Sequence, residues 1–319
     1  MVLATKTMKC IIIYFSQSEN TKKVAHAIHK GMSQLVEQCD ITRLTRIDVR
    51  DLNQYDLIGM GSPVWNGVPA HVKLFINAMP SLSGKHSFAF CTHGTMPRRF
   101  FPNVVRLLKK RGLIVIGTRD WYGSVNHPLL PKPYFTDGHP DEADLKEAED
   151  FGREMVEVSR RISAGETELI PPLPPMPPRR TSKRPLFHLK LNTKKCQYPE
   201  CRLCMDHCRL KVIDLSVSPP VFPKKCQPCY FCEMICPEGA IEADYESDAK
   251  LETGRARRKF TEALDQAEAA GRFRRLVPKE DIGWNTPYYK VYSNHPRYVL
   301  PEEDSDNKPL FALSTKSPA

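Results

Sequence analysis

The chain has 319 residues, of which 41% are hydrophobic, and its formal net charge is +10 at pH 7. This length exceeds that of one small domain and predicts two domains with additional segments. No apolar run reaches the roughly 18 residues that a transmembrane helix needs, so we expect no membrane span. The stretch before Ile11 is too short and polar for a secretory signal, and we expect a cytoplasmic protein.

The distribution of the cysteines favours metal binding over disulfide bonding. Eight of the eleven cysteines lie between Cys196 and Cys236, whereas Cys10, Cys39 and Cys91 are scattered. Dense clustering in a chain without secretory features is typical of thiolates that bind metal. Cys10 and Cys91 lie in predicted buried strands, where we expect them to be small core residues.

The charge is uneven along the chain. Residues 179–225 are rich in Lys and Arg, whereas residues 141–168 are rich in acids. A basic region can compensate negatively charged cofactors, attract an acidic protein partner or bind nucleic acid. We favour the first two interpretations over nucleic-acid binding.

The first half of the chain alternates predicted strands and helices. The apolar run at 8–15 is typical of a buried parallel strand, and the periodic stretch at 22–35 predicts an amphipathic helix. Further strands are expected at 41–49, 55–60, 87–91 and within 112–122, and further helices at 70–78, 103–111 and 141–162. This alternation predicts an α/β doubly wound parallel sheet, for which the strand order 2-1-3-4-5 is one of two common solutions.

A proline-rich segment, PPLPPMPP at 171–178, separates two regions of the chain. Its composition excludes the interior of a helix or sheet and favours a stiff polyproline II spacer over a ligand for a proline-binding module. The expected organisation is a first domain at 1–167, a linker at 168–187, a cysteine-rich domain at 188–246, and a C-terminal helix and extended tail at 247–319. A charged helix is expected at 252–273, and no structure is assigned to the tail from residue 278.

The stronger of two cysteine motifs has the spacing C-x2-C-x2-C-x3-C-P. It consists of Cys226, Cys229, Cys232, Cys236 and Pro237. Bacterial ferredoxins use this run. Three closely spaced thiolates can bind three irons of one cubane, while the fourth cysteine reaches a neighbouring cluster. Pro237 then turns the chain away from a further helical turn.

The other motif has the spacing C-x4-C-x2-C-x3-C. It consists of Cys196, Cys201, Cys204 and Cys208, and Arg209 follows where proline would be expected. Two structural zinc sites would also need four cysteines each. Zinc suits pairs of C-x2-C with a longer insert between them, so these runs favour iron–sulfur clusters.

Three polar loops follow predicted strands, where ligands bind in doubly wound sheets. They contain Ser16, Gln17, Ser18, Glu19, Asn20 and Thr21; Ser62, Pro63, Val64, Trp65 and Asn66; and Thr92, His93, Gly94 and Thr95. Hydroxyls and free backbone N–H groups at a helix N-terminus form an anion site, and Trp65 can lie against a planar ring. A capped turn, a core Trp65 and an exposed His93 are the alternatives. Further candidates after the fifth strand are Asp120, Tyr122, Asn126 and His127.

The first loop resembles the phosphate loop of flavodoxins, except that Glu19 stands where glycine is usual. A carboxylate there must point outward, or it would repel the phosphate. With its cysteine motifs, the chain resembles the flavodoxin–ferredoxin fusion family. The flavodoxin-like match covers about 8–165 and the ferredoxin match about 188–245, and residues 285–297 also resemble the C-terminal part of such fusions without suggesting a role.

This resemblance implies a flavodoxin-like domain that binds FMN through the three loops and a small α+β ferredoxin-like domain that binds two 4Fe–4S clusters. It also implies which cysteines share a cluster. One set is Cys196, Cys201, Cys204 and Cys236, and the other is Cys226, Cys229, Cys232 and Cys208.

The expected function is electron transfer between FMN and the two clusters, to a separate redox partner protein. The alternative is an oxidoreductase that reduces a small acceptor, such as a quinone, at the flavin. A nucleic-acid-binding iron–sulfur protein is the least favoured interpretation. The chain has no G-x-G-x-x-G after a predicted strand, which weakens direct oxidation of a nicotinamide cofactor.

Overall fold

The structure is a computed structural model. It describes residues 8–65, 67–178, 189–208, 210–217, 226 and 229–301, with the side chains of 247–257 left out. Contacts between Cα atoms divide the chain into two compact units. We call Met1–Val125, Phe135–Arg179 and Glu268–Val277 the sheet unit, and Asn126–Tyr134, Arg180–Ala267 and Pro278–Ala319 the cysteine unit.

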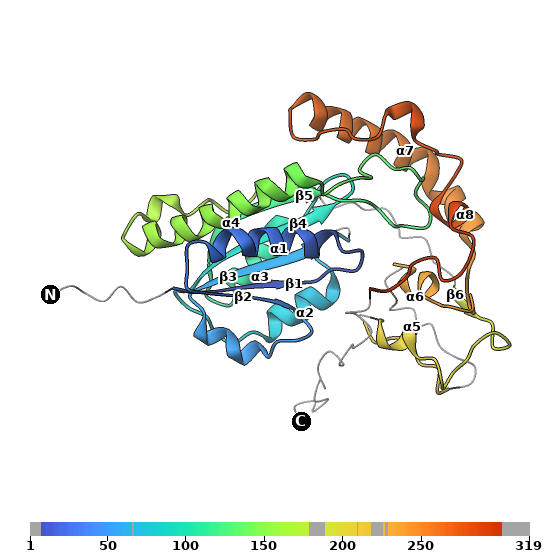
Figure 1. The fold of residues 1–319 in the computed structure, drawn as a ribbon, viewed down its shortest axis with the longest axis horizontal. Coiled ribbons are helices and arrows are strands. Elements are labelled where there is room, and N and C mark those ends of the chain that lie inside the picture. The colour runs from blue at the N-terminus through green and yellow to red at the C-terminus, as the bar shows by residue number, and fades with distance from the viewer. Residues whose placement is uncertain are drawn as a thin grey trace. The chain divides into compact units, whose positions relative to one another are not determined.

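Five parallel strands form the centre of the sheet unit (Figure 1). Their bounds are β1 Lys9–Tyr14, β2 Gln38–Arg43, β3 Leu57–Pro63, β4 His86–His93 and β5 Ile114–Tyr122. The strand order is β2-β1-β3-β4-β5, which confirms the order expected from the sequence. β4 is buried along its whole length, as a central parallel strand must be when helices cover both faces.

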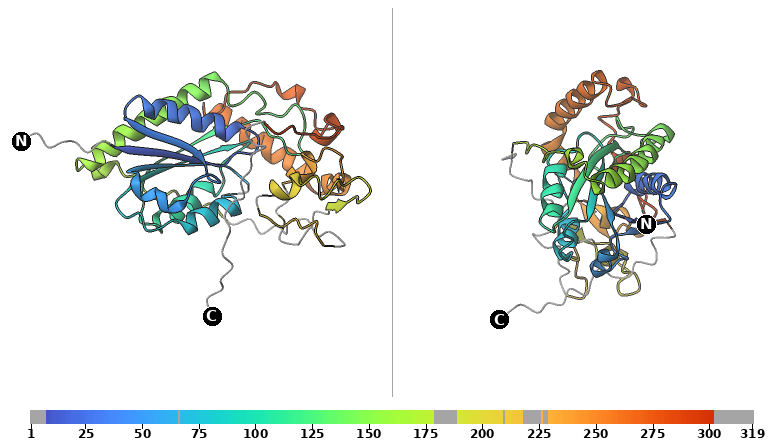
Figure 2. Two further views of the ribbon diagram at one scale, coloured as in Figure 1. Left: turned by 60° about the horizontal axis from the view of Figure 1, so that its bottom comes forward. Right: turned by 90° about the vertical axis from the view of Figure 1, so that its left-hand side faces the viewer.

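Helices cover both faces of this sheet. α1 (Asn20–Ser33) and α4 (Glu142–Ser163) lie on one face, and α2 (Ala70–Ala78) and α3 (Phe100–Lys109) lie on the other (Figure 2). The expected helices therefore all form, and α2 has the predicted bounds. A short 3-10 helix, η2 (Thr167–Leu169), follows α4.

Two glycines allow α1 and α4 to approach closely. A Cβ atom at Gly31 would lie 1.9 Å from the carbonyl oxygen of Glu149, and a Cβ atom at Gly152 would lie 2.2 Å from the carbonyl oxygen of Ile28. Neither position has room for a side chain unless the helices move apart. The apolar faces of both helices join one core cluster with the sheet.

The second strand differs most from its expected position. It was predicted at 41–49 but lies at Gln38–Arg43, and a 3-10 helix, η1, follows at Val49–Gln54. The Asp48 carboxylate accepts a hydrogen bond from the Arg50 N–H at 2.9 Å and so caps η1. Because β2 is a half-buried edge strand, its apolar pattern marks its ends poorly.

The cysteine unit consists mainly of short elements. The short elements are β6 Leu189–Leu191, α5 Leu203–Asp206, α6 Phe231–Met234, β7 Ile241–Ala243, η3 Lys279–Asp281 and α8 Tyr288–Val291. The long helix α7, Tyr245–Ala269, also belongs to this unit except for its last two residues. β6 and β7 pair antiparallel. The charged helix expected at 252–273 begins earlier and ends before Gly271, whose φ is 67°. Within the described residues, no helix of either unit is long and apolar enough to cross a membrane.

Two segments belong to a different unit from the one that a division of the chain at the proline-rich segment would assign to them. Asn126–Tyr134 belongs to the cysteine unit, where Leu129 packs with Tyr230 and Tyr245. Glu268–Val277 belongs to the sheet unit. Packing against residues distant in the sequence determines the unit to which each segment belongs. Local composition does not reveal such long-range packing.

The proline-rich segment is partly attached to the sheet unit. Residues 171–178 have no regular secondary structure, and the Arg99 Nε donates a hydrogen bond to the Met176 Sδ at 3.0 Å. Residues 179–187 of the expected linker lie outside the described residues. The Arg106 Nη1, in α3, lies 3.9 Å from the Met176 Sδ, so the proline-rich segment contacts α3 and Arg99, the residue before it.

Candidate functional site

The loop after β1 leads directly into α1. Glu19, which precedes the helix, has a φ of 61°. This left-handed conformation suits glycine and costs other residues roughly 1–2 kcal/mol. The Glu19 carboxylate lies 2.9 Å from the Lys22 Nζ and 3.3 Å from the Arg43 Nη2. Two cations therefore compensate the charge at the position where flavodoxins usually have glycine.

Hydrogen bonds join the predicted loops at the carboxyl edge of the sheet. The hydroxyls of Thr21 and Thr92 lie 2.7 Å apart and link the first loop to the third. The Val64 N–H donates to the Thr92 carbonyl at 3.0 Å and links the second loop to the third. The Asn20 Nδ2 donates to the Ser124 carbonyl at 2.7 Å, which adds the segment after β5. The structure thus brings together residues that are up to 104 positions apart.

Other predicted residues lie at the ends of β3 and β4. Ser62 and Pro63 end β3, and the Ser62 hydroxyl donates to the Pro63 carbonyl at 2.9 Å. Gly94 and Thr95 follow β4 and are half-buried. Asn66, which was also predicted at this site, lies outside the described residues.

Trp65 is half-buried and rests on two other rings. Its ring centroid lies 5.6 Å from that of Phe15 and 5.6 Å from that of His71, in edge-to-face arrangements. Such contacts fix the orientation of an aromatic side chain. Trp65 is therefore neither a core residue nor a freely exposed one.

His93 is buried and pairs with Asp120, whose side chain is 37% exposed. The His93 Nε2 lies 2.7 Å from the Asp120 Oδ2, and the His93 side chain is only 3% exposed. Tyr122 lies edge-on to the imidazole, with ring centroids 4.8 Å apart. His93 is thus not the exposed residue that one interpretation of the sequence allowed.

Two nitrogens at this edge are buried without a hydrogen-bond partner among the described residues. They are the Gln17 Nε2 and the His93 Nδ1. Leaving such a group unsatisfied costs about 1–3 kcal/mol. Unpartnered buried polar atoms in two converging loops fit the presence of a polar ligand.

Of the candidates after β5, Asp120 and Tyr122 belong to the sheet unit, whereas Asn126 and His127 belong to the cysteine unit. The ring of His127 lies 5.6 Å from that of Tyr230. Burial lowers the pKa of His127 to about 4, so the imidazole is neutral at physiological pH. It serves as a packed ring in that unit.

Four cysteines line one pocket in the cysteine unit. They are Cys196, Cys201, Cys204 and Cys236. The pocket is otherwise lined largely by apolar side chains, including Leu191, Leu215 and Ile241. Burial raises the pKa of Cys204 to about 12, and the neighbouring Cys236, Cys196 and Cys201 raise it further in that order. Cys196, whose spacing is unusual, thus lies with the other three.

The remaining four clustered cysteines also neighbour one another. Burial raises the pKa of Cys226 to about 11, with further contributions from Cys229 and Cys208. Burial likewise raises the pKa of Cys232, and Cys229 and Cys226 contribute next, followed by Cys204 and Cys208. Arg209, which follows Cys208, lies outside the described residues.

These thiols are suited to binding a cationic centre. All eleven cysteines are free thiols. The raised pKa values of Cys204, Cys226 and Cys232 mean that burial and neighbouring cysteines disfavour their thiolates unless positive charge compensates them. A bound metal supplies that charge and deprotonates the thiols that coordinate it.

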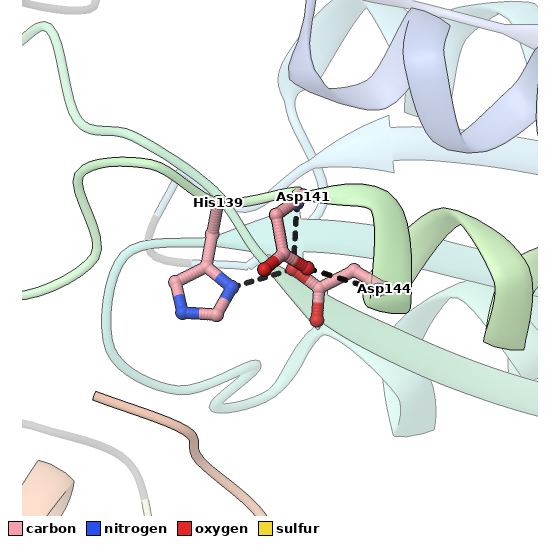
Figure 3. Close-up of side chains that lie close together, drawn as sticks. All are labelled: His139, Asp141 and Asp144. Carbon is pink, nitrogen blue, oxygen red and sulfur yellow. Dashed lines mark hydrogen bonds and ion pairs between the residues drawn. The ribbon is translucent and has the colours of Figure 1, made fainter. Parts of the chain in front are cut away.

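A cluster of His139, Asp141 and Asp144 was not singled out in the sequence (Figure 3). The His139 Nδ1 lies 2.5 Å from the Asp144 Oδ2, and its Nε2 lies 2.7 Å from the Arg274 carbonyl oxygen. Asp141 caps α4 and forms an ion pair with Arg274 at 2.6 Å. Because both imidazole nitrogens are engaged, this cluster holds the segment Glu268–Val277 on α4 and offers no imidazole ligand to a metal.

Comparison with known proteins agrees with the observed topology. Residues 11–109 match the family model described as a flavodoxin domain. An uncharacterised protein of Methanocaldococcus jannaschii is 27% identical over 156 residues, which cover 47% of this chain and 99% of that protein. The N-terminal part of the chain, in the sheet unit, is therefore a flavodoxin-like domain.

Similar solved structures include a flavodoxin from the domain Archaea and the two-electron reduced flavodoxin of Megasphaera elsdenii. The archaeal protein is 20% identical with a TM-score of 0.38, and the match covers 48% of this chain and 99% of that one. The M. elsdenii protein is 22% identical with a TM-score of 0.35, and the match covers 44% of this chain and 97% of that one.

Proposed function

We propose that the protein transfers electrons between FMN, bound at the carboxyl edge of the sheet, and two 4Fe–4S clusters, and passes them to a separate redox partner protein. The observation that supports this most strongly is that eight cysteines lie near one another and that four of them line one pocket. The same chain carries a flavodoxin-like domain. Together, a flavin and cubanes connect one-electron with two-electron chemistry.

The residues at the sheet edge fit FMN. In this proposal, the hydroxyls of Ser16, Ser18 and Thr21 and the N-terminus of α1 hold the phosphate. The unpartnered nitrogens of Gln17 and His93 provide hydrogen bonds to polar atoms of the flavin. Trp65 contributes an aromatic surface, and Asp120 orients the His93 imidazole from the opposite nitrogen.

The eight cysteines supply four thiolates for each of two 4Fe–4S clusters, and they lie near one another. One cluster takes Cys196, Cys201, Cys204 and Cys236, and the other takes Cys226, Cys229, Cys232 and Cys208. The apolar lining of the first set limits access of water, which is one of the means by which a protein tunes the potential of a cluster.

Metal and flavin analysis of matched variants tests the proposal. Protein purified without oxygen should contain about eight irons, eight sulfides and one FMN per chain. Cys204→Ser and Cys232→Ser should each lower the iron content by about half or more. Cys39→Ser, in the edge strand β2, should keep the full content and serves as the control.

Two results would contradict the proposal. One is zinc in place of iron and sulfide, and the other is unchanged iron content in both cluster variants. Rapid reduction of a quinone by the isolated protein would instead favour an oxidoreductase that acts on a small acceptor.

A further inference from the structure

A buried carboxylate lies within the second cysteine motif. Glu233 belongs to α6, between Cys232 and Cys236, and its side chain is only 2% exposed. A buried charge destabilises a fold unless it is paired and hydrogen-bonded. The proposed function alone gives this residue no role.

Glu233 is held by residues from two other segments of the cysteine unit. The Arg297 Nε donates to the Glu233 Oε1 at 2.8 Å, and the Tyr245 hydroxyl donates to the Glu233 Oε2 at 2.5 Å. The His295 Nε2 lies 3.7 Å from the Glu233 Oε1. Both carboxylate oxygens are therefore occupied, and a guanidinium that is 11% exposed compensates the charge.

Arg297 is itself fixed in place. Its Nη1 donates to the Tyr289 carbonyl at 2.9 Å, and its own carbonyl accepts a hydrogen bond from the Tyr288 hydroxyl at 2.9 Å. The Tyr298 N–H donates to the Met234 carbonyl at 2.9 Å. The segment 288–298, most of which lies in the region 285–297 to which the sequence gave no role, is thus bonded directly to α6, the helix that contains the proposed ligand Cys232.

We propose that Arg297 is a positioning residue for both iron–sulfur clusters. It fixes α6 through Glu233. Cys232 lies in α6 and Cys236 follows two residues after its end, and the two belong to different proposed clusters. Its guanidinium also cancels the Glu233 charge where the clusters would add negative charge. The inference rests on the proposed function, and it makes residues 288–298 part of the cluster-binding unit.

Opposite changes in charge distinguish this role from simple packing. Arg297→Met leaves Glu233 unpaired, so the cluster midpoint potentials should become more negative and loss of iron to a chelator should be at least tenfold faster. Glu233→Gln leaves Arg297 uncompensated, so the potentials should become more positive. The double variant should return close to the wild-type potentials, and Arg297→Lys should restore part of the iron retention.

Lys290→Met removes an exposed cation from the same segment and is the matched control. It should change neither the potentials nor the rate of iron loss. The inference is overturned if Arg297→Met behaves like this control, or if Arg297→Met and Glu233→Gln shift the potentials in the same direction. If the Arg297→Met variant does not fold, the Glu233→Gln variant alone tests the inference. Unchanged cluster midpoint potentials in that variant would overturn the inference. Wild-type protein without iron would instead refute the proposed function.

Discussion

Glu19 is the residue at which the first loop departs from the usual flavodoxin pattern. It adopts a conformation that suits glycine, yet it forms ion pairs with Lys22 and Arg43. Its carboxylate offsets two cations that would otherwise be available to an anion at the α1 N-terminus. The residue should therefore weaken phosphate binding while leaving the contacts to a flavin ring unchanged.

Glu19→Gln should tighten the binding of FMN by about 1 kcal/mol, or roughly fivefold in Kd. The affinity for riboflavin, which lacks the phosphate, should stay the same. Titration of the apoprotein with each flavin, followed by quenching of flavin fluorescence, measures both constants. Equal effects on the two flavins would show that Glu19 does not act on a phosphate.

The contact between α1 and α4 determines how closely helices cover the sheet. Gly152→Ala would place a methyl group against the Ile28 carbonyl, where the ideal Cβ position is 2.2 Å from the oxygen. We expect a loss of about 1–3 kcal/mol in the free energy of unfolding, measured with urea. Glu157→Ala, on the exposed face of α4, should change it by less than about 0.5 kcal/mol. Similar values for the two variants would contradict the proposed packing.

His139 attaches the segment Glu268–Val277 to α4 in a manner that depends on protonation. Its nitrogens face the Asp144 carboxylate and the Arg274 carbonyl, so only the imidazolium can donate to both. Burial opposes protonation, but the hydrogen bonds to Asp144 and to the Arg274 carbonyl outweigh it and raise the His139 pKa. Asp141 and the Arg274 side chain, which pair with each other, are the other charged groups at this site.

Because the pKa of His139 is raised on folding, its stabilisation is complete below the ordinary histidine value of about 6.5. It is lost as the pH rises through the raised value. His139→Gln should therefore destabilise the sheet unit more at about pH 5.5 than at about pH 8.5. Urea unfolding at both pH values measures the difference, and His26→Gln, an exposed histidine of α1, is the control. A pH-independent effect at His139 would contradict the double hydrogen bond.

Some elements could be predicted from sequence because their signals are local. The helix at 70–78 follows Pro69 and was predicted with its observed bounds. The convergence of the three loops was predictable because parallel strands end at one edge of a sheet. The contacts of His139 with Arg274 and of Glu233 with Arg297 were not, since 135 and 64 residues separate the partners. No local pattern marks such pairs.

At the scale of the whole molecule, the chain passes between the two units five times. Asn126–Tyr134 belongs to the cysteine unit, although the residues before and after it belong to the sheet unit. Glu268–Val277 belongs to the sheet unit, although the residues before and after it belong to the cysteine unit. A division at the proline-rich segment would therefore leave each part without residues that pack in its core. The proposed electron transfer depends on both units being present in one chain.

Electron transfer within one molecule is the central claim, and rapid mixing tests it most directly. Anaerobic protein would be mixed with less than one equivalent of a one-electron reductant, and flavin and cluster absorbance would be followed together. The account predicts that electrons redistribute between clusters and flavin with a rate constant independent of protein concentration. Redistribution whose rate rises in proportion to protein concentration, or protein without both cofactors, would contradict it.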